Sequence, residues 1–105
     1  ESVFIRDSQT KSTVSLETKE LEIIFKASKV GLFNLYTLSE TNQKSMIYEG
    51  EIIKGVNSKV FKIPKKSLED IIYMRKKLWF EGENILSLLG KPQKIIKEKI
   101  QLRLK

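Results

Sequence analysis

The 105-residue sequence contains neither cysteine nor histidine. Without cysteine there can be no disulfide, no thiolate nucleophile, and no iron–sulfur or cysteine–zinc site. Without histidine the usual general base near neutral pH, the Ser-His-Asp triad and most transition-metal sites are excluded. The five glycines are scattered along the chain, so no glycine-rich loop for phosphate is present. These absences indicate a non-enzymatic protein that needs no cofactor.

Long apolar runs are absent as well, because Lys or Glu interrupts the hydrophobic stretches. No segment is therefore long enough to cross a bilayer as a helix. A mass of 12.2 kDa and 40% hydrophobic residues suit one folded domain with a real core. We expect this single domain over residues 13–105, preceded by a strand or linker over residues 1–12. Since the chain begins with Glu1 and not Met, we also expect a trimmed or mature form.

Apolar and polar residues alternate through most of the first two-thirds of the chain. In Leu21–Ala27 every second residue is apolar, with Glu22 and Lys26 on the opposite face. A period of two with β-branched and aromatic residues predicts a strand that is buried on one side. Further strands are predicted at Leu32–Leu38, Met46–Ile53 and Lys59–Ile63. The polar segments between them predict turns at Ser39–Lys44, with Asn42 at positive φ, and at Lys54–Ser58.

Residues 67–80 fit two kinds of secondary structure. Ser67 stands at a helix-capping position, and the apolar residues after it have helical spacing. A strand also fits, because apolar residues alternate with others from Ile72 to Phe80. Glu81–Asn84 predicts a tight turn, and the alternation at the C-terminus predicts a closing strand over Ile100–Leu104. The sequence thus predicts a mainly β protein, an antiparallel β-sandwich, with one short helix around residues 67–78 as the open alternative.

Positive charge is concentrated in the C-terminal part of the chain. There are 20 Lys and Arg residues against 13 acids, which gives a net charge of +7. Residues 1–60 hold eight of each sign, whereas residues 61–105 hold twelve basic and five acidic residues. Such an excess either marks an anionic partner or keeps a surface soluble. Because 17 of the 20 are Lys, and bidentate phosphate recognition needs Arg, the composition favours a solvated basic face.

One candidate binding surface consists of Arg75, Lys76, Lys77 and Trp79. In a regular strand Trp79 and its neighbour Phe80 point to opposite faces, so only one of them can enter the core. An exposed tryptophan beside a basic run can stack on a nucleobase or anchor a protein partner.

A second candidate is an edge strand formed by Val3, Phe4 and Ile5, which carry no charge. The predicted closing strand, in contrast, carries Lys97, Lys99, Arg103 and Lys105, and charged side chains of this kind protect a sheet edge from unwanted pairing. We therefore expect Val3–Ile5 to be held by an adjacent strand, by a second copy of the chain or by a partner.

The order and spacing of the strands suggest a type of module. The pattern formed by Leu21–Ala27, Phe33–Leu38, Met46–Ile53, Val60–Ile63, Ile71–Met74 and Ile100–Leu104 resembles immunoglobulin-like or fibronectin-type modules of bacterial envelope or secreted proteins. The Cys…Trp…Cys framework of true immunoglobulin domains is missing, which excludes that subclass. The resemblance implies a non-catalytic module for protein–protein contact in a larger extracytoplasmic protein of the periplasm or cell envelope.

Nucleic-acid binding through the basic C-terminal part is the alternative function. Leu78–Phe80 together with Asn84–Gly90 is similar to a DNA-binding segment of the phage antirepressor type. Neither the protein-binding hypothesis nor the nucleic-acid hypothesis involves a metal or another cofactor.

Overall fold

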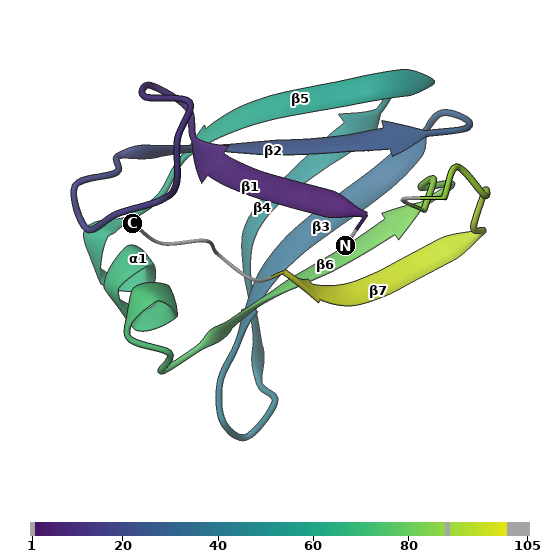
Figure 1. Cartoon of the computed structure of the whole chain (residues 1–105). Coiled ribbons are helices and arrows are strands. Elements are labelled where there is room, and N and C mark those ends of the chain that lie inside the picture. The colour runs from purple at the N-terminus through teal and green to yellow at the C-terminus, as the bar shows by residue number, and fades with distance from the viewer. Residues whose placement is uncertain (1, 88, 101–105) are drawn as a thin grey trace.

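The computed structural model describes residues 2–87 and 89–100, which form two antiparallel β-sheets packed face to face (Figure 1). The mainly β prediction is confirmed, and so is the antiparallel sandwich. In chain order the elements are β1 Val3–Asp7, β2 Glu20–Ala27, β3 Gly31–Leu38, β4 Lys44–Ile52, β5 Gly55–Lys62, α1 Lys65–Ile72, β6 Lys77–Glu83 and β7 Ile95–Ile100. One sheet has the order β1-β2-β5 and the other the order β4-β3-β6-β7.

Three phenylalanines form the centre of the core between the sheets. Phe25 of β2, Phe33 of β3 and Phe80 of β6 have ring centroids 5.1–5.8 Å apart, and each is at most 2% exposed. Phe25 meets Phe33 edge-on and Phe80 at a tilt, whereas Phe33 and Phe80 are stacked with their planes inclined by 25°. All three distances lie in the range in which aromatic rings attract one another. Because Phe25 belongs to one sheet and the other two to the second sheet, the two contacts of Phe25 hold the sheets together.

Two glycines make room for these rings. A Cβ atom at Gly82 would lie 2.7 Å from the Phe80 ring, and one at Gly50 would lie 2.8 Å from the Phe33 ring. Real Cβ atoms do not come this close to other atoms, so any side chain here would displace a ring. Gly82 therefore lies inside β6 and faces the core, and the predicted tight turn at Glu81–Asn84 is wrong. β6 continues through Glu83, and the chain leaves the strand at Asn84, which has φ 56°.

The connection between β4 and β5 is also shorter than predicted. Only Ile53 and Lys54 separate the strands, and Gly55, at φ 100°, already begins β5. The side chain of Asn57 is buried behind this turn, where it accepts from the Ile53 N–H at 3.0 Å and donates to the Ile53 carbonyl at 2.9 Å. Asn57 was expected in the turn, but it lies in β5, and its side chain stabilises the turn through these two hydrogen bonds. The positive φ predicted for Asn42 is confirmed at 61°.

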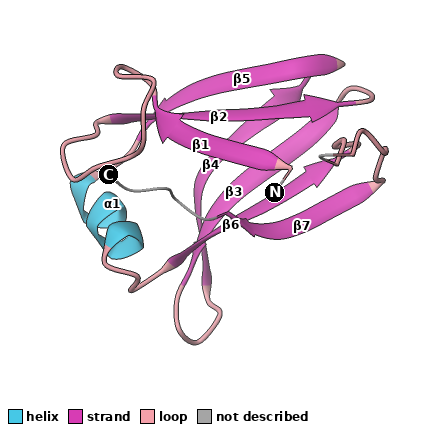
Figure 2. Cartoon of the chain, in the orientation of Figure 1, coloured by secondary structure: helices cyan, strands magenta, loops and turns pink. Residues whose placement is uncertain are grey.

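The sequence allowed either a helix or a strand over residues 67–80, and the structure has both: a helix in the first part and a strand in the last (Figure 2). α1 starts after Pro64, two residues before Ser67, and ends at Ile72, whereas β6 starts at Lys77. Leu68 and Ile71 lie on the inner side of the helix and are buried. The helix is shorter than the predicted 67–78 because Met74, at φ 61°, reverses the chain. The described residues contain no helix long and apolar enough to cross a membrane.

The two sheets also meet along their borders. Tyr48 of β4 stacks on Phe61 of β5, with centroids 4.6 Å apart and planes inclined by 12°. On the other border, the Ser2 N–H donates to Glu98 Oε1 of β7 at 3.1 Å. Ile100, the last residue of β7, is buried as predicted, and the rest of the predicted strand Ile100–Leu104 lies outside the described residues.

Candidate binding surface

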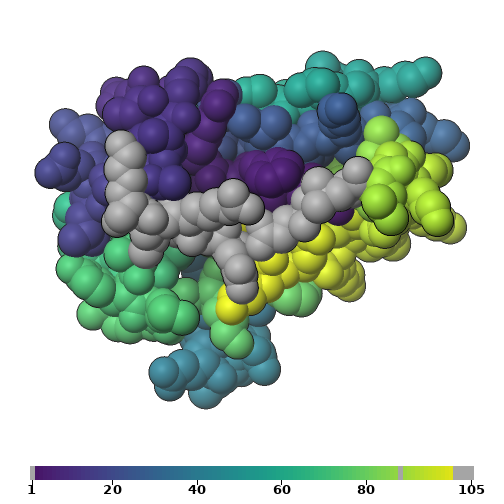
Figure 3. All heavy atoms as spheres, viewed as in Figure 1, coloured from purple at the N-terminus to yellow at the C-terminus, as the bar shows by residue number. Residues whose placement is uncertain are grey.

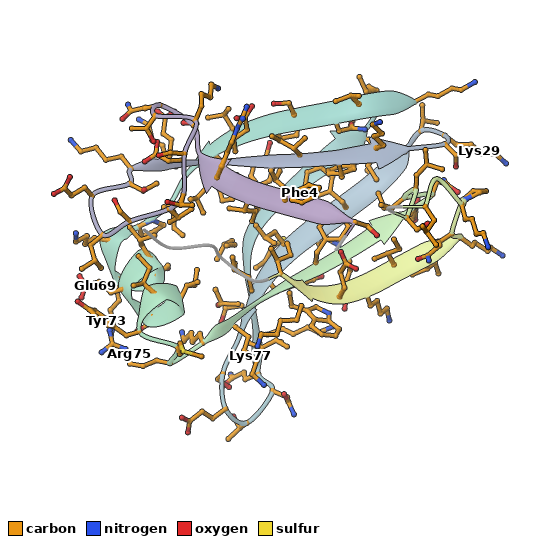
Figure 4. All side chains as sticks on the ribbon, viewed as in Figure 1. Phe4, Lys29, Glu69, Tyr73, Arg75 and Lys77 are labelled. Carbon is orange, nitrogen blue, oxygen red and sulfur yellow. The ribbon has the colours of Figure 1, made fainter. Side chains whose placement is uncertain are left out.

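The predicted surface of Arg75, Lys76, Lys77 and Trp79 is divided between two places in the fold. Arg75 and Lys76 lie in the turn between α1 and β6, beside the end of the helix, while Lys77 begins β6 (Figure 4). Trp79 lies two residues further along β6, on the outer face of the four-stranded sheet, opposite the buried Phe80. The structure therefore brings Lys77 and Trp79 to one sheet, but gives Arg75 and Lys76 a different setting.

That setting is a cluster around the carboxylate of Asp70 on α1. Arg75 Nε and Lys66 Nζ each lie 3.0 Å from Asp70 Oδ1, and Lys76 Nζ lies 3.8 Å from Oδ2. The hydrogen bond from Lys66, together with the other two cations, holds the pKa of Asp70 below its usual value. The negative charge of Asp70 partly neutralises Arg75 and Lys76, which weakens their attraction for a nucleic acid.

Trp79 belongs to a row of large side chains that crosses three strands. Tyr36 of β3 is paired with Trp79 of β6 on one side and with Met46 of β4 on the other. Directly opposed residues on adjacent strands lie 4.5–5.5 Å apart, so the three side chains are neighbours on the outer face. Met46 is 50% exposed, and both aromatic rings are partly exposed. We call Tyr36, Met46 and Trp79 the outer row.

Glu81 fixes the orientation of this row. Its Oε1 accepts a hydrogen bond from the indole N–H of Trp79 at 3.0 Å and another from Lys44 Nζ at 2.6 Å. Lys44 in turn lies 5.1 Å from the centroid of the Tyr36 ring. The ammonium of Lys44 lowers the pKa of Glu81, and Glu81 raises the pKa of Lys44, so both stay charged at neutral pH. Both aromatic side chains are thereby held before any partner arrives.

Polar residues surround the outer row on the same face. Lys77 and Lys99, both exposed, come from β6 and β7, and Lys99 is paired directly with Trp79. On the other side of the row Asn34 is paired with Glu49 and with Glu81. An aromatic centre with a polar rim is the usual composition of a protein interface.

The second predicted site, Val3, Phe4 and Ile5, lies in β1 at the edge of the three-stranded sheet, where it pairs with β2. Val3 is fully buried in the core, and Ile5 packs partly against it. Phe4 points outward and is 48% exposed beside Ile24 of β2. Figure 4 shows the Phe4 side chain on the outer side of β1.

The sequence reading missed Tyr36, Met46 and Glu81 as members of a surface. In the predicted strand Tyr36 falls on the face opposite Leu35 and Thr37, and that parity was the available signal. The signal was not sufficient, because the alignment of Tyr36 with Met46 depends on a register shift between Leu35 and Tyr36. Pairing across β3 and β6 joins residues about forty positions apart or more, which local alternation does not encode.

Within residues 2–87 and 89–100, acidic side chains do not gather in groups of three that could hold a metal ion. The sequence matches no protein-family model, and comparisons with curated proteins and with solved structures find no match.

Proposed function

We propose that this chain is a non-catalytic, immunoglobulin-like module that makes protein–protein contact within a larger extracytoplasmic protein. The strand order supports the type of module. In immunoglobulin constant domains the first, second and fifth strands share one sheet with the fourth, and the third, sixth and seventh share the other. Here β1, β2 and β5 share one sheet and β3, β6 and β7 the other, with β4 beside β3 instead of β5.

The core supports the same proposal. Immunoglobulin domains link their second and sixth strands by a disulfide, against which a tryptophan of the third strand packs. In this chain Phe25 of β2 and Phe80 of β6 are 5.5 Å apart, and Phe33 of β3 packs against both. Three aromatic rings thus occupy the strands that carry the disulfide and the tryptophan in those domains.

The observation that carries the binding function is the outer row. Trp, Tyr and Met are enriched at protein interfaces, and a few such residues contribute most of the binding energy. Trp79 and Tyr36 are held in place by Glu81 and Lys44, so ordering them on binding costs little entropy. These features favour a partner protein that covers Tyr36, Met46 and Trp79.

The chain offers a direct reporter, because Trp79 is its single tryptophan. We expect acrylamide to quench Trp79 fluorescence less once fractions of an envelope extract that contain the partner are added. Tyr36→Ala and Met46→Ala should each weaken retention of that partner at least tenfold, as expected for central interface residues. Tyr73→Ala is the matched control, since Tyr73 is an exposed aromatic residue at the end of α1.

Unchanged quenching together with full retention by both outer-row variants would refute this assignment. Lys77 and Lys99 beside the outer row favour single-stranded nucleic acid as the second candidate, because aromatic rings among lysines can stack bases. Submicromolar binding of an oligonucleotide at physiological salt, lost in Tyr36→Ala, would establish that candidate instead.

A further inference from the structure

The antiparallel strand order brings three connections to one end of the sandwich. These are the β2–β3 turn, residues 28–30, the β4–β5 turn, residues 53–54, and the β6–β7 loop, of which residues 84–87 and 89–94 are described. Figure 1 shows all three at the right, opposite α1, and Figure 4 shows Lys29 there. Because the end of β2 pairs with the start of β5, Ala27 with Gly55, the first two turns are neighbours.

Hydrogen bonds tie the third connection to the first. The Ser28 N–H donates to the Asn84 carbonyl at 2.8 Å, and the Asn84 side-chain amide donates to the Val30 carbonyl at 3.1 Å. The Leu86 N–H also donates to the Lys26 carbonyl at 2.8 Å. The three connections therefore form one supported surface, and the space-filling view shows their atoms at the same end (Figure 3). We call this surface the loop end.

Each connection of the loop end exposes an aliphatic side chain. Val30 is 72% exposed, Ile53 is 56% exposed and Leu89 is 83% exposed. Scattered apolar residues are ordinary on protein surfaces, but here one occurs in every connection at one end. At the opposite end the β3–β4 loop consists of polar residues alone, but the β1–β2 loop exposes Leu16 (36%) and the turn after α1 exposes Tyr73 (56%) and Met74 (84%). Apolar exposure alone therefore does not distinguish the loop end, and the charge of its connections has to be considered as well.

Lysines accompany these aliphatic residues. Lys29 precedes Val30, Lys54 follows Ile53, and Lys91 follows Leu89 by two positions. None of the three connections contains Asp or Glu, whereas the connections at the α1 end contain acids of their own, Glu17, Glu40, Glu69 and Asp70. The three connections of the loop end thus carry positive charge alone, with the carboxylate of Glu83, the last residue of β6, beside Gly31, whereas the connections at the opposite end carry both signs.

The residue types indicate the kind of partner. Protein interfaces are poor in Lys and are anchored by Trp, Tyr and Arg, and single-stranded nucleic acids are stacked on aromatic rings. The tips of the loop end carry aliphatic residues and Lys. Aliphatic side chains on separate turns can insert between the lipids of a bilayer, which rearrange around them, and nearby lysines are attracted to anionic headgroups.

We propose that the loop end docks on the surface of an anionic lipid bilayer. Val30, Ile53 and Leu89 enter the boundary between headgroups and acyl chains, while Lys29, Lys54 and Lys91 bind the anionic headgroups. The outer row lies on a sheet face and not at this end, so docking leaves it free for a protein partner. The site therefore goes beyond the proposed function and does not depend on it.

The test is co-sedimentation of the purified chain with vesicles of phosphatidylcholine alone or with 30 mol% phosphatidylserine. We expect binding to the anionic vesicles only, and weaker binding in high salt. The triple variant Lys29→Ala, Lys54→Ala and Lys91→Ala should bind about a hundredfold more weakly, since each lysine near such a surface contributes about fivefold. Lys19→Ala, Lys62→Ala and Lys65→Ala together are the control, because they remove the same charge away from the loop end.

A second variant separates insertion from simple charge attraction. Val30→Ser, Ile53→Ser and Leu89→Ser together leave the charge unchanged and should weaken binding to the anionic vesicles about tenfold. Equal losses in the two lysine variants would overturn the proposal, because net charge alone would then explain the binding. So would full binding by the serine variant, which would point to a soluble polyanion, or no binding to anionic vesicles by the unmodified chain.

Discussion

Glu22 of β2 offers the sharpest test of the electrostatics of this fold. It lies on the outer side of the three-stranded sheet, yet it is only 5% exposed. Arg6 Nε lies 2.6 Å and Lys11 Nζ 3.3 Å from Glu22 Oε1, and the Ser58 hydroxyl donates to Oε2. The hydrogen bond from Ser58, followed by that from Arg6, lowers the pKa of Glu22 from 4.5 to about 2.

The perturbation is Glu22→Gln, which keeps the shape of the side chain and removes its charge. A drop of this size in the pKa corresponds to at most about 3 kcal/mol of stability at neutral pH. Arg6 and Lys11 keep 39% and 55% of their side-chain surface in solvent, which screens the interaction and reduces the expected loss to about 1–2 kcal/mol.

The pH dependence follows from the direction of the shift. Because the pKa of Glu22 is lower in the folded state, its contribution is complete above about pH 4.5 and is lost as the pH falls toward 2. Urea unfolding followed by circular dichroism should therefore show the two proteins differing at pH 7, with the difference shrinking steadily below pH 4.5 and small by pH 2.5. The control is Glu40→Gln in the exposed β3–β4 loop, which should change little at either pH. A difference that stays constant from pH 7 to pH 2.5 would show that the charge of Glu22 is not the cause.

Two further predictions concern the core. Phe80→Ala removes the ring that contacts both Phe25 and Phe33, and it should lower the free energy of unfolding by about 3–5 kcal/mol in urea titrations. Gly82→Ala should lower the melting temperature and destabilise the fold by about 1–3 kcal/mol, because its Cβ would lie 2.7 Å from the Phe80 ring. A melting temperature at or above that of the unmodified chain would contradict the role assigned to Gly82.

The sequence predicted those parts of the fold that depend on near neighbours. Alternation in Leu21–Ala27 identified both β2 and its buried side, because a strand repeats every two residues. The same pattern placed Glu22 on the outer side, which is where it lies. Its burial was not predictable, since the covering residues Arg6 and Lys11 come from β1 and the loop after it.

Other features required the tertiary structure. A glycine between two glutamates is typical of a turn, yet Gly82 lies inside β6 because the Phe80 ring needs the space. Of the candidate residues, Trp79 lies on the outer face opposite the core residue Phe80, and alternation required only that the two point to opposite faces. Arg75 and Lys76 were grouped with it through their sequence positions, and only the fold reveals that Asp70 draws them toward α1.

The strand order has a consequence for how the chain acquires its structure. β2 is paired with β1 before it and with β5 after it, and β3 and β4 lie between β2 and β5 in the sequence but belong to the other sheet. Pairing of distant segments slows folding, because the intervening loop must be closed before the contacts form. During synthesis the backbone groups on one edge of β2 have no partner until β5, which ends at Lys62, has left the ribosome. One edge of β6 is unpaired in the same way until β7 has been made. The newly made chain thus exposes two apolar strands for seconds at ordinary elongation rates, the interval in which a holding chaperone would act.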